Sequence, residues 1–146
     1  MRSLTLTIPG VPIAQRRPRF ARRGKFVVTY SDQATEAGKF LLEARRQAHG
    51  VFLEGPLSLE VICVFPRPKS HFGTGKNADK LKASAPEDHT KKPDCTNLCK
   101  FVEDCLNDEV YKDDSQICVV RIRKVYAEDG CQPYTWIKLT ELEGLP

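Results

Sequence analysis

The sequence predicts a single α+β domain, with an α/β-type mixed sheet of about five strands and two helices. Apolar residues alternate in short segments bounded by Gly and Pro, which is typical of strands. Two longer segments carry apolar residues at helical spacing. The 146 residues are 40% hydrophobic and 29% charged, a balance that fits one globular domain with one core over residues 1–146.

The N-terminal part is expected to contain a strand, a basic arm and a helix. Residues 2–8 alternate approximately and end at a Pro-Gly pair. Residues 12–26 contain two prolines, which disfavour a helix and indicate an extended arm or hairpin that turns at Arg23-Gly24. Residues 25–30 then form its second strand. A helix of about 33–49 follows, because its apolar residues form one stripe and a glycine ends it.

The C-terminal part is expected to contain three strands and a second helix. Residues 57–65 have apolar residues on both faces, which predicts a central strand. Residues 66–92 are rich in Lys, Pro and Gly and are expected to be a mobile loop, because neither side has enough chain for a separate domain. The apolar spacing predicts a helix of about 95–107. Strands at 117–126 and 134–139 are expected to close the chain as a hairpin.

Charge is distributed very unevenly along the chain. The net charge is +4, yet residues 1–50 hold ten Lys or Arg against three acids, and residues 94–116 hold two against seven. A basic surface beside a compact acidic block is typical of a polyanion held near a cation site. Uneven surface charge without a function is the alternative.

The acidic block carries the candidate chemistry. Asp94 precedes the second helix, and Asp113-Asp114 follow it. A 13-residue helix is about 20 Å long, so Asp94 and Asp114 meet only if the strand runs back along the helix or the turn folds under it. Carboxylates that do meet favour Mg²⁺, or Mn²⁺, over Zn²⁺. Lys100 is then placed to contact a phosphate. The alternative is that Asp94 only caps the helix and that Asp113-Asp114 are surface residues of a turn without a functional role.

The basic arm is a candidate DNA-binding surface. Arginine is preferred where paired donors grip phosphates, and two phenylalanines interleave the run. A solubilising surface is the alternative. The candidate DNA-binding residues, which include two lysines just before the acidic block, are Arg16, Arg17, Arg19, Arg22, Arg23, Lys25, Lys91 and Lys92.

Two segments resemble the RusA family of Holliday junction resolvases, which are common in phages and prophages. They are KPDCTNLCKFVEDCLNDEVYKDDSQICVVRIRKVY and the opening IPGVPIAQRRPRF. The resemblance covers about residues 1–126 and implies a homodimeric nuclease that uses Mg²⁺ to cut paired strands of a four-way DNA junction. It implies that Asp94 and Asp114 bind metal and that Lys100 is catalytic. Asp104 and Asp113 match acidic positions of the same motif and are further candidate metal ligands.

One position departs from the family pattern. The third essential aspartate of the family falls at Thr96, a weak and neutral ligand. Three outcomes follow from this departure. The missing oxygen ligand comes from Glu103, Asp104 or Asp113, or it comes from a water molecule held by Thr96. In the third outcome the protein binds branched DNA but cuts it poorly. An active enzyme is the favoured interpretation. Thr96 is also a competent N-cap. A small metal-binding or regulatory protein unrelated to DNA is a third hypothesis.

The remaining features concern compartment and redox state. No apolar run approaches the ~18 residues of a membrane span, and the N-terminus lacks the apolar segment of a signal peptide. A cytoplasmic protein of a bacterial or phage-infected cell, without a membrane partner, is expected. The six cysteines form no CxxC pair and are expected to be buried or idle thiols.

Overall fold

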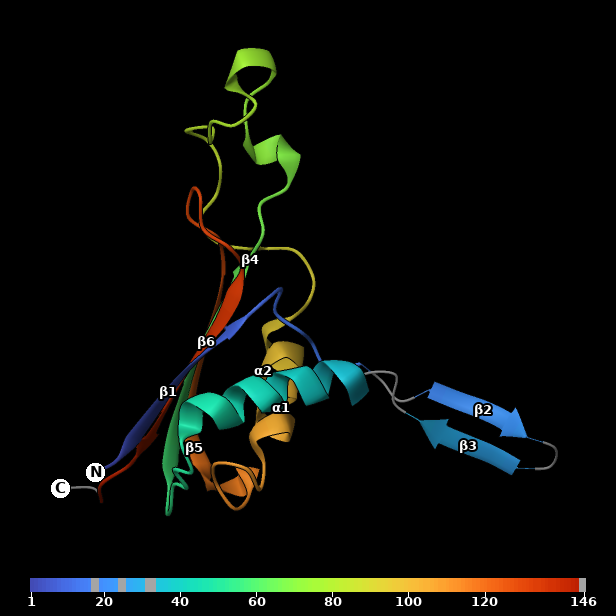
Figure 1. Cartoon of the computed structure of the whole chain (residues 1–146), viewed down its shortest axis with the longest axis vertical. Coiled ribbons are helices and arrows are strands. Elements are labelled where there is room, and N and C mark those ends of the chain that lie inside the picture. Colours follow the sequence, from blue (N-terminus) through green and yellow to red (C-terminus); the bar gives the residue numbers. More distant parts are fainter. Residues whose placement is uncertain (17–18, 24–25, 31–33, 145–146) are drawn as a thin grey trace.

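The computed structural model describes residues 1–16, 19–23, 26–30 and 34–144, with side chains described outside residues 17–34. Its helices and strands are β1 (Ser3–Pro9), β2 (Arg19–Arg23), β3 (Phe26–Tyr30), α1 (Ala34–Ala48), β4 (Leu57–Phe65), α2 (Cys95–Leu106), β5 (Ile117–Tyr126) and β6 (Tyr134–Glu141). The α+β class and both helices are confirmed. The described residues contain six strands rather than about five, because the basic arm contributes a strand on each side of its turn (Figure 1).

Four strands form a mixed sheet in the order β1-β6-β4-β5. The central position of β4 is confirmed, since it pairs with β6 on one side and with β5 on the other. The predicted C-terminal hairpin is wrong: β5 pairs in parallel with β4, and β6 lies on the far side of β4. Parallel strands need a long crossover, and the segment between β4 and β5 provides one that contains α2. The sheet is therefore extended at one edge by a β4-α2-β5 unit.

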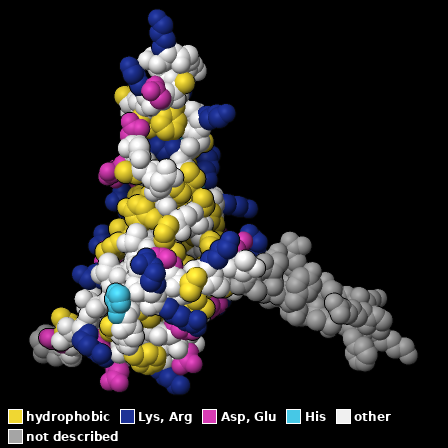
Figure 2. Space-filling view, in the orientation of Figure 1, with side chains coloured by type: hydrophobic (Ala, Val, Ile, Leu, Met, Phe, Trp, Pro, Cys, Tyr) yellow, Lys and Arg dark blue, Asp and Glu magenta, His cyan; other side chains and the backbone are white. Residues whose placement is uncertain are grey.

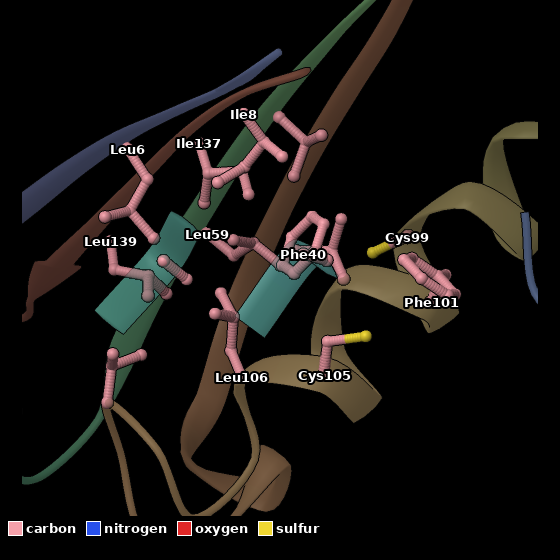
Figure 3. Close-up of a cluster of buried hydrophobic side chains, with 14 of the residues drawn as sticks. Leu6, Ile8, Phe40, Leu59, Cys99, Phe101, Cys105, Leu106, Ile137 and Leu139 are labelled. Carbon is pink, nitrogen blue, oxygen red and sulfur yellow. The ribbon is translucent and has the colours of Figure 1, made fainter. Parts of the chain in front are cut away.

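One face of the sheet and the two helices enclose the core (Figure 3). The predicted alternation of β1 is confirmed, since Leu4, Leu6 and Ile8 are buried and the residues between them are exposed. Val61 at the centre of β4 lies beside Ile137 and is almost fully buried. The buried residues of β1 and the first part of β4 alternate with period two, so one face of the sheet packs against the layer of helices.

The two helices contribute apolar stripes to this core. The stripe of α2 is buried as its spacing predicts, and it comprises Leu98, Phe101, Val102, Cys105 and Leu106. Phe40 of α1 meets Phe101 of α2 edge to face, with ring centroids 5.5 Å apart. The opposite face of α2 is polar and largely exposed. Burial of one stripe therefore decides which side chains of α2 face solvent.

Residues 66–93 form an extension, here called the lobe, that projects beyond the end of the sheet (Figure 1). Its base contacts the sheet, because the ring of His89 stacks on Phe65 at 4.0 Å between centroids. Its tip contains short 3₁₀ turns and a bridge between Phe72 and Leu81. The expected mobility of this segment in the absence of DNA stays a prediction.

Candidate functional site

Asp94 lies at the N-cap of α2, with an extended backbone conformation. Its carbonyl oxygen accepts the amide hydrogen of Leu98 at 3.1 Å, but its carboxylate makes no capping hydrogen bond. The side chain is exposed. The N-terminal end of a helix favours a negative charge, which stabilises an ionised carboxylate there. Asp94 thus holds the capping position and keeps its carboxylate oxygens free of capping bonds.

Lys124 holds the segment that leads into Asp94. Its Nζ donates hydrogen bonds to the carbonyl oxygens of Lys91 and Pro93, at 2.6 and 2.7 Å. Lys124 pairs in register with Cys63 on the helix-covered side of the sheet, so its ammonium group points toward the start of α2. Lys124 was not among the residues with a predicted role. The sequence feature that indicates such a role is the position of this lysine on a strand of alternating residues, where its side chain faces the core.

The polar face of α2 carries the predicted catalytic lysine. Lys100 is exposed, as are Asn97 and Asp104, and these three positions follow the spacing of one helical face. Lys100 makes no salt bridge with a described residue. Its charge is therefore available to an anion in solution.

Thr96 lies within the first turn of α2 and is exposed. Its interpretation as the N-cap is wrong, because Asp94 occupies that position and the helix begins at Cys95. The backbone of Asp94 is extended, so the helix cannot begin before Cys95. Thr96 thus places a neutral hydroxyl two residues from the carboxylate of Asp94.

Asp113 and Asp114 lie beyond the C-terminal end of α2 and have different roles. Asp113 caps the 3₁₀ turn Asp114–Gln116, with its carboxylate accepting hydrogen bonds from the amide and the hydroxyl of Ser115. These hydrogen bonds lower the pKa of Asp113. The backbone amide of Asp114 donates to Oδ1 of Asn107 at 2.8 Å, and the Asp114 side chain makes no hydrogen bond with a described residue. Asn107 is thus a positioning residue for Asp114, a role that the sequence analysis missed.

Tyr111 lies at the same end of α2 and is fully buried. Its hydroxyl donates to the carbonyl oxygen of Glu103 at 2.8 Å. Burial raises the pKa of Tyr111, and the nearby charges of Glu103, Asp114 and Asp104 raise it further. The charges of Glu103, Asp104 and Asp114 thus all act on one buried tyrosine at the C-terminal end of α2, while Asp94 lies at the other end of the helix.

Within one chain, Asp94 and Asp114 lie at opposite ends of α2. The 12 residues of this helix span about 18 Å. The strand does run back along α2, but Asp114 precedes the strand and stays at its far end. In the part of the chain that the structure describes, no three His, Cys, Asp or Glu side chains lie close enough to hold a metal ion.

The basic arm is a hairpin, as the sequence predicts. β2 and β3 pair antiparallel, from Arg19 beside Tyr30 to Arg23 beside Phe26. The hairpin projects away from the sheet beyond the start of α1 (Figure 1). Arg16, which precedes it, forms an ion pair with Glu36 at 3.3 Å. Among the other predicted DNA-binding residues, Lys91 and Lys92 are exposed, the backbones of Arg19, Arg22 and Arg23 lie in β2, and Arg17 and Lys25 lie outside the described residues.

The cysteines are free thiols, as expected. Burial raises the pKa values of Cys63, Cys99 and Cys105 to about 12, so these three are protonated near neutral pH. A protonated, buried thiol neither binds a metal nor acts as a nucleophile.

Exposed carboxylates and an unpaired lysine on one helix, flanked by a basic hairpin and a lysine-rich lobe, are features of a protein that acts on a polyanion. The family model of Endodeoxyribonuclease RusA matches residues 9–138. The chain therefore belongs to the RusA endodeoxyribonuclease family. It is also similar to a Bacillus subtilis (strain 168) protein described as uncharacterized protein YqaN, with 33% identity over 131 residues that cover 88% of this chain and 92% of that protein.

Membership of this family confirms the resemblance seen in the two sequence segments and gives the chain the class of an endodeoxyribonuclease. None of the helices that the structure describes is long and apolar enough to cross a membrane.

Proposed function

We propose that this protein is a Mg²⁺-dependent endonuclease that resolves four-way DNA junctions by paired phosphodiester hydrolysis. The observation that carries the proposal is the exposed set of Asp94 and Lys100 on α2, with Asp114 held beyond its end by Asn107, in a member of an endodeoxyribonuclease family. Carboxylate oxygens are donors that favour Mg²⁺ and Mn²⁺ over Zn²⁺, and the chain has only three histidines, scattered at positions 49, 71 and 89.

The separation of Asp94 from Asp114 indicates that the metal site needs two chains. Two carboxylates at opposite ends of a helix of about 18 Å cannot share one ion in a single chain. A two-fold axis beside α2 places two copies of this helix antiparallel. Asp94 of one copy then lies level with Asp114 of the other, and two equivalent sites form. A resolvase must make two symmetric cuts, which such a dimer provides.

The free edge of the sheet is a suitable dimer surface. β5 pairs with β4 along one edge, and residues 87–89 of the lobe meet only the C-terminal end of its other edge, through a bridge between Asp88 and Val125. The rest of that edge is unpaired in the described residues and exposes Val119 and Val120, at 50% and 47% of their surface. Exposed apolar edge strands readily pair with another chain. Antiparallel pairing of two β5 strands extends both sheets into one. It also brings the two copies of α2 side by side, because α2 packs beside β5 in each chain.

The residues have separate roles in this proposal. Asp94 and Asp114 hold the metal, which would polarise the scissile phosphate and activate water. Lys100 contacts the phosphate and stabilises the negative charge that develops on it. Lys124 fixes the backbone before Asp94, and Asn107 fixes the backbone of Asp114. Glu103 and Asp104, in the last turn of α2, and Asp113, next to Asp114, are the candidate sources of an oxygen to replace the missing aspartate.

Cleavage of a labelled four-way junction with Mg²⁺ and with EDTA tests the function. We expect paired nicks only with Mg²⁺, and we expect Asp114→Asn to lower the cleavage rate by about 10²-fold or more without loss of junction binding. Loss of binding and cleavage together would show that Asp114 is structural. Cleavage that persists in EDTA would exclude the metal.

Mixing two inactive variants tests the shared site. Asp94→Asn and Asp114→Asn are each expected to be inactive. If each site takes one aspartate from each chain, one of the two sites in a mixed dimer keeps both aspartates. Random exchange makes about half of the dimers mixed, so about one quarter of all sites are intact. Recovery of nicking on mixing supports the shared site. No recovery, with chain exchange shown by differently labelled subunits, contradicts it.

Thr96 favours a second candidate, a junction-binding protein that cuts poorly. Its exposed hydroxyl contributes no charge two residues from Asp94. Under this candidate the wild type binds the junction without cutting, and Thr96→Asp restores cleavage. Under the favoured function the wild type cuts, and Thr96→Ser, which keeps the hydroxyl, is a neutral control.

A further inference from the structure

The tip of the lobe carries positive charge that no described residue neutralises. Its lysines are exposed, and none makes a salt bridge with a described residue; they are Lys69, Lys76, Lys80 and Lys82. Asp79 is the one acidic residue among residues 69–82, whereas Glu87 and Asp88 nearer the base pair with Arg123. Figure 2 shows Lys and Arg side chains on the upper end of the molecule, where Figure 1 places the lobe.

The lobe has a built shape rather than being a loose chain. The amide of Gly73 donates to the carbonyl of Lys80 at 3.0 Å, and the amide of Lys82 donates to the carbonyl of His71 at 2.9 Å. Gly73 packs so closely on Asn77 that a Cβ atom there would lie 2.6 Å from the Asn77 carbonyl oxygen. The lysines therefore project from a turn with defined geometry, which reduces the entropy lost when they bind a ligand.

The base of the lobe is fixed to the sheet. Arg67 donates hydrogen bonds to the carbonyl oxygens of Ala127 and Pro86, at 2.8 and 2.7 Å, and lies over the ring of Tyr126. The buried ring of His89 lies between Phe65 and Tyr126. Burial and the charge of Lys124 lower the pKa of His89, so the ring is neutral near pH 7.

The same base is connected to the proposed site. Lys124 of β5 donates to the carbonyls of Lys91 and Pro93, at the end of the lobe, and Asp94 follows directly. The position of the lobe is thus set relative to the N-terminal end of α2. Figure 1 places its tip beyond the sheet, away from α2. A straight duplex along the polar face of α2 offers phosphates along one axis, whereas a branched DNA also offers them on arms that leave this axis.

We propose that residues 69–82 form a second DNA-contacting surface. Lysines on this preformed turn bind the phosphates of a junction arm that leads away from the point of cutting. The protein therefore selects branched DNA over linear DNA. This inference rests on the proposed function, because it assumes that DNA lies at α2. The chemistry of the partner is a duplex backbone held by ammonium groups, which bind phosphate as point charges without reading the base sequence.

Equilibrium binding tests this surface on the full chain with Asp114→Asn, which prevents cutting during the measurement. The lobe variant adds Lys76→Gln and Lys80→Gln. The matched control adds Lys39→Gln and Lys138→Gln, which remove the same charge from exposed lysines on α1 and β6. Each protein is titrated with a synthetic four-way junction and with a linear duplex of the same number of nucleotides. The titrations are repeated between about 50 and 200 mM salt, because an affinity that depends on phosphate contacts changes strongly over this range.

We expect the lobe variant to bind the junction about tenfold more weakly and to lose about 1.8 from the slope of log K against log salt, since each phosphate contact contributes about 0.9. We expect its affinity for the linear duplex, and the junction affinity of the control, to change less than twofold. Equal weakening on both DNAs would make the lobe a general DNA contact and would overturn the selection of branched DNA.

A junction affinity that matches the Asp114→Asn parent would overturn the lobe surface altogether. These results are separable from failure of the proposed function, which shows as a wild type that neither cuts the junction nor binds it more tightly than the duplex. Thermal unfolding of both variants checks that they are folded.

Discussion

At the scale of single residues, the same residue type has different roles at different positions. Lys124 donates to two carbonyl oxygens and holds the backbone before Asp94, whereas Lys100 is exposed and unpaired on α2. Asp113 caps a turn, while Asp114 next to it makes no side-chain hydrogen bond with a described residue. Hydrogen-bond partners therefore separate the residues that hold the structure from those available to a ligand.

Glu141 gives a pH-dependent prediction at this scale. Its carboxylate accepts hydrogen bonds from the side chain and amide of Arg2 and from the amide of Glu54, which lower its pKa to about 2. The native state therefore favours the ionised carboxylate. This stabilisation is complete above the unfolded pKa of about 4.5 and is lost as the pH falls from there toward 2.

We expect Glu141→Gln to lower the melting temperature at pH 7, and we expect the difference from wild type to shrink steadily between pH 4.5 and pH 2.5. Differential scanning calorimetry across this range measures it. Glu128→Gln, at an exposed glutamate with no described ion pair, is the control and should leave the melting temperature nearly unchanged. A difference for Glu141→Gln that does not vary with pH would contradict the role of the ionised carboxylate.

At the scale of elements, α2 and the lobe show how packing leaves some surfaces free. The buried stripe of α2 contacts the core, and so its polar face must point to solvent. The lobe contributes little to the main core, since its contacts with the sheet are concentrated at its base. Local changes in the lobe tip should thus alter the lobe without unfolding the domain.

Gly73→Ala tests this separation. The added Cβ would clash with the Asn77 carbonyl oxygen, so the turn must shift. We expect faster amide hydrogen exchange at Gly73 and Lys82, whose hydrogen bonds close the tip, and a melting temperature within a few degrees of wild type. Gly38→Ala, at a helical glycine with open space around it, is the control and should not alter exchange in the lobe. Unchanged protection in Gly73→Ala would show that the tip tolerates the contact.

At the scale of the whole molecule, the proposed metal site is incomplete in one chain, so the function depends on whether two chains form a dimer. We expect the wild type to sediment as a species of twice 16.5 kDa at micromolar concentration. Val119→Lys combined with Val120→Lys should give the monomer and abolish cleavage, because like charges would then oppose each other across the β5 edge. Leu42→Lys, at an apolar residue that is 71% exposed on α1, should remain a dimer.

A wild type that cleaves junctions as a monomer would contradict both the dimer and the shared site. A dimer that survives both lysine substitutions on β5 would place the interface elsewhere.

Much of the fold follows from local pattern. The helices at 34–48 and 95–106 and the strand at 117–126 lie within one or two residues of their predicted ranges, because apolar spacing and Gly or Pro boundaries act over a few residues. The pairing of β5 with β6 was predicted wrongly, because a short connection between two strands favours a hairpin only if no third strand lies between them. β4 takes that place and pairs with β6 along one edge and with β5 along the other, as expected for a central strand with apolar residues on both faces.

The sequence by itself determined the chemistry available: the aspartates and the lysine of the motif, the basic arm, the departure at Thr96 and the membership of an endodeoxyribonuclease family. Only the tertiary structure decided that Asp94 and Asp114 stand at opposite ends of α2, that Asp113 is a cap, and that the lysines of the lobe project beyond the sheet. Residue types are local properties of the chain. The distances between them depend on non-local strand pairing and on the rigid length of a helix, which no short segment encodes.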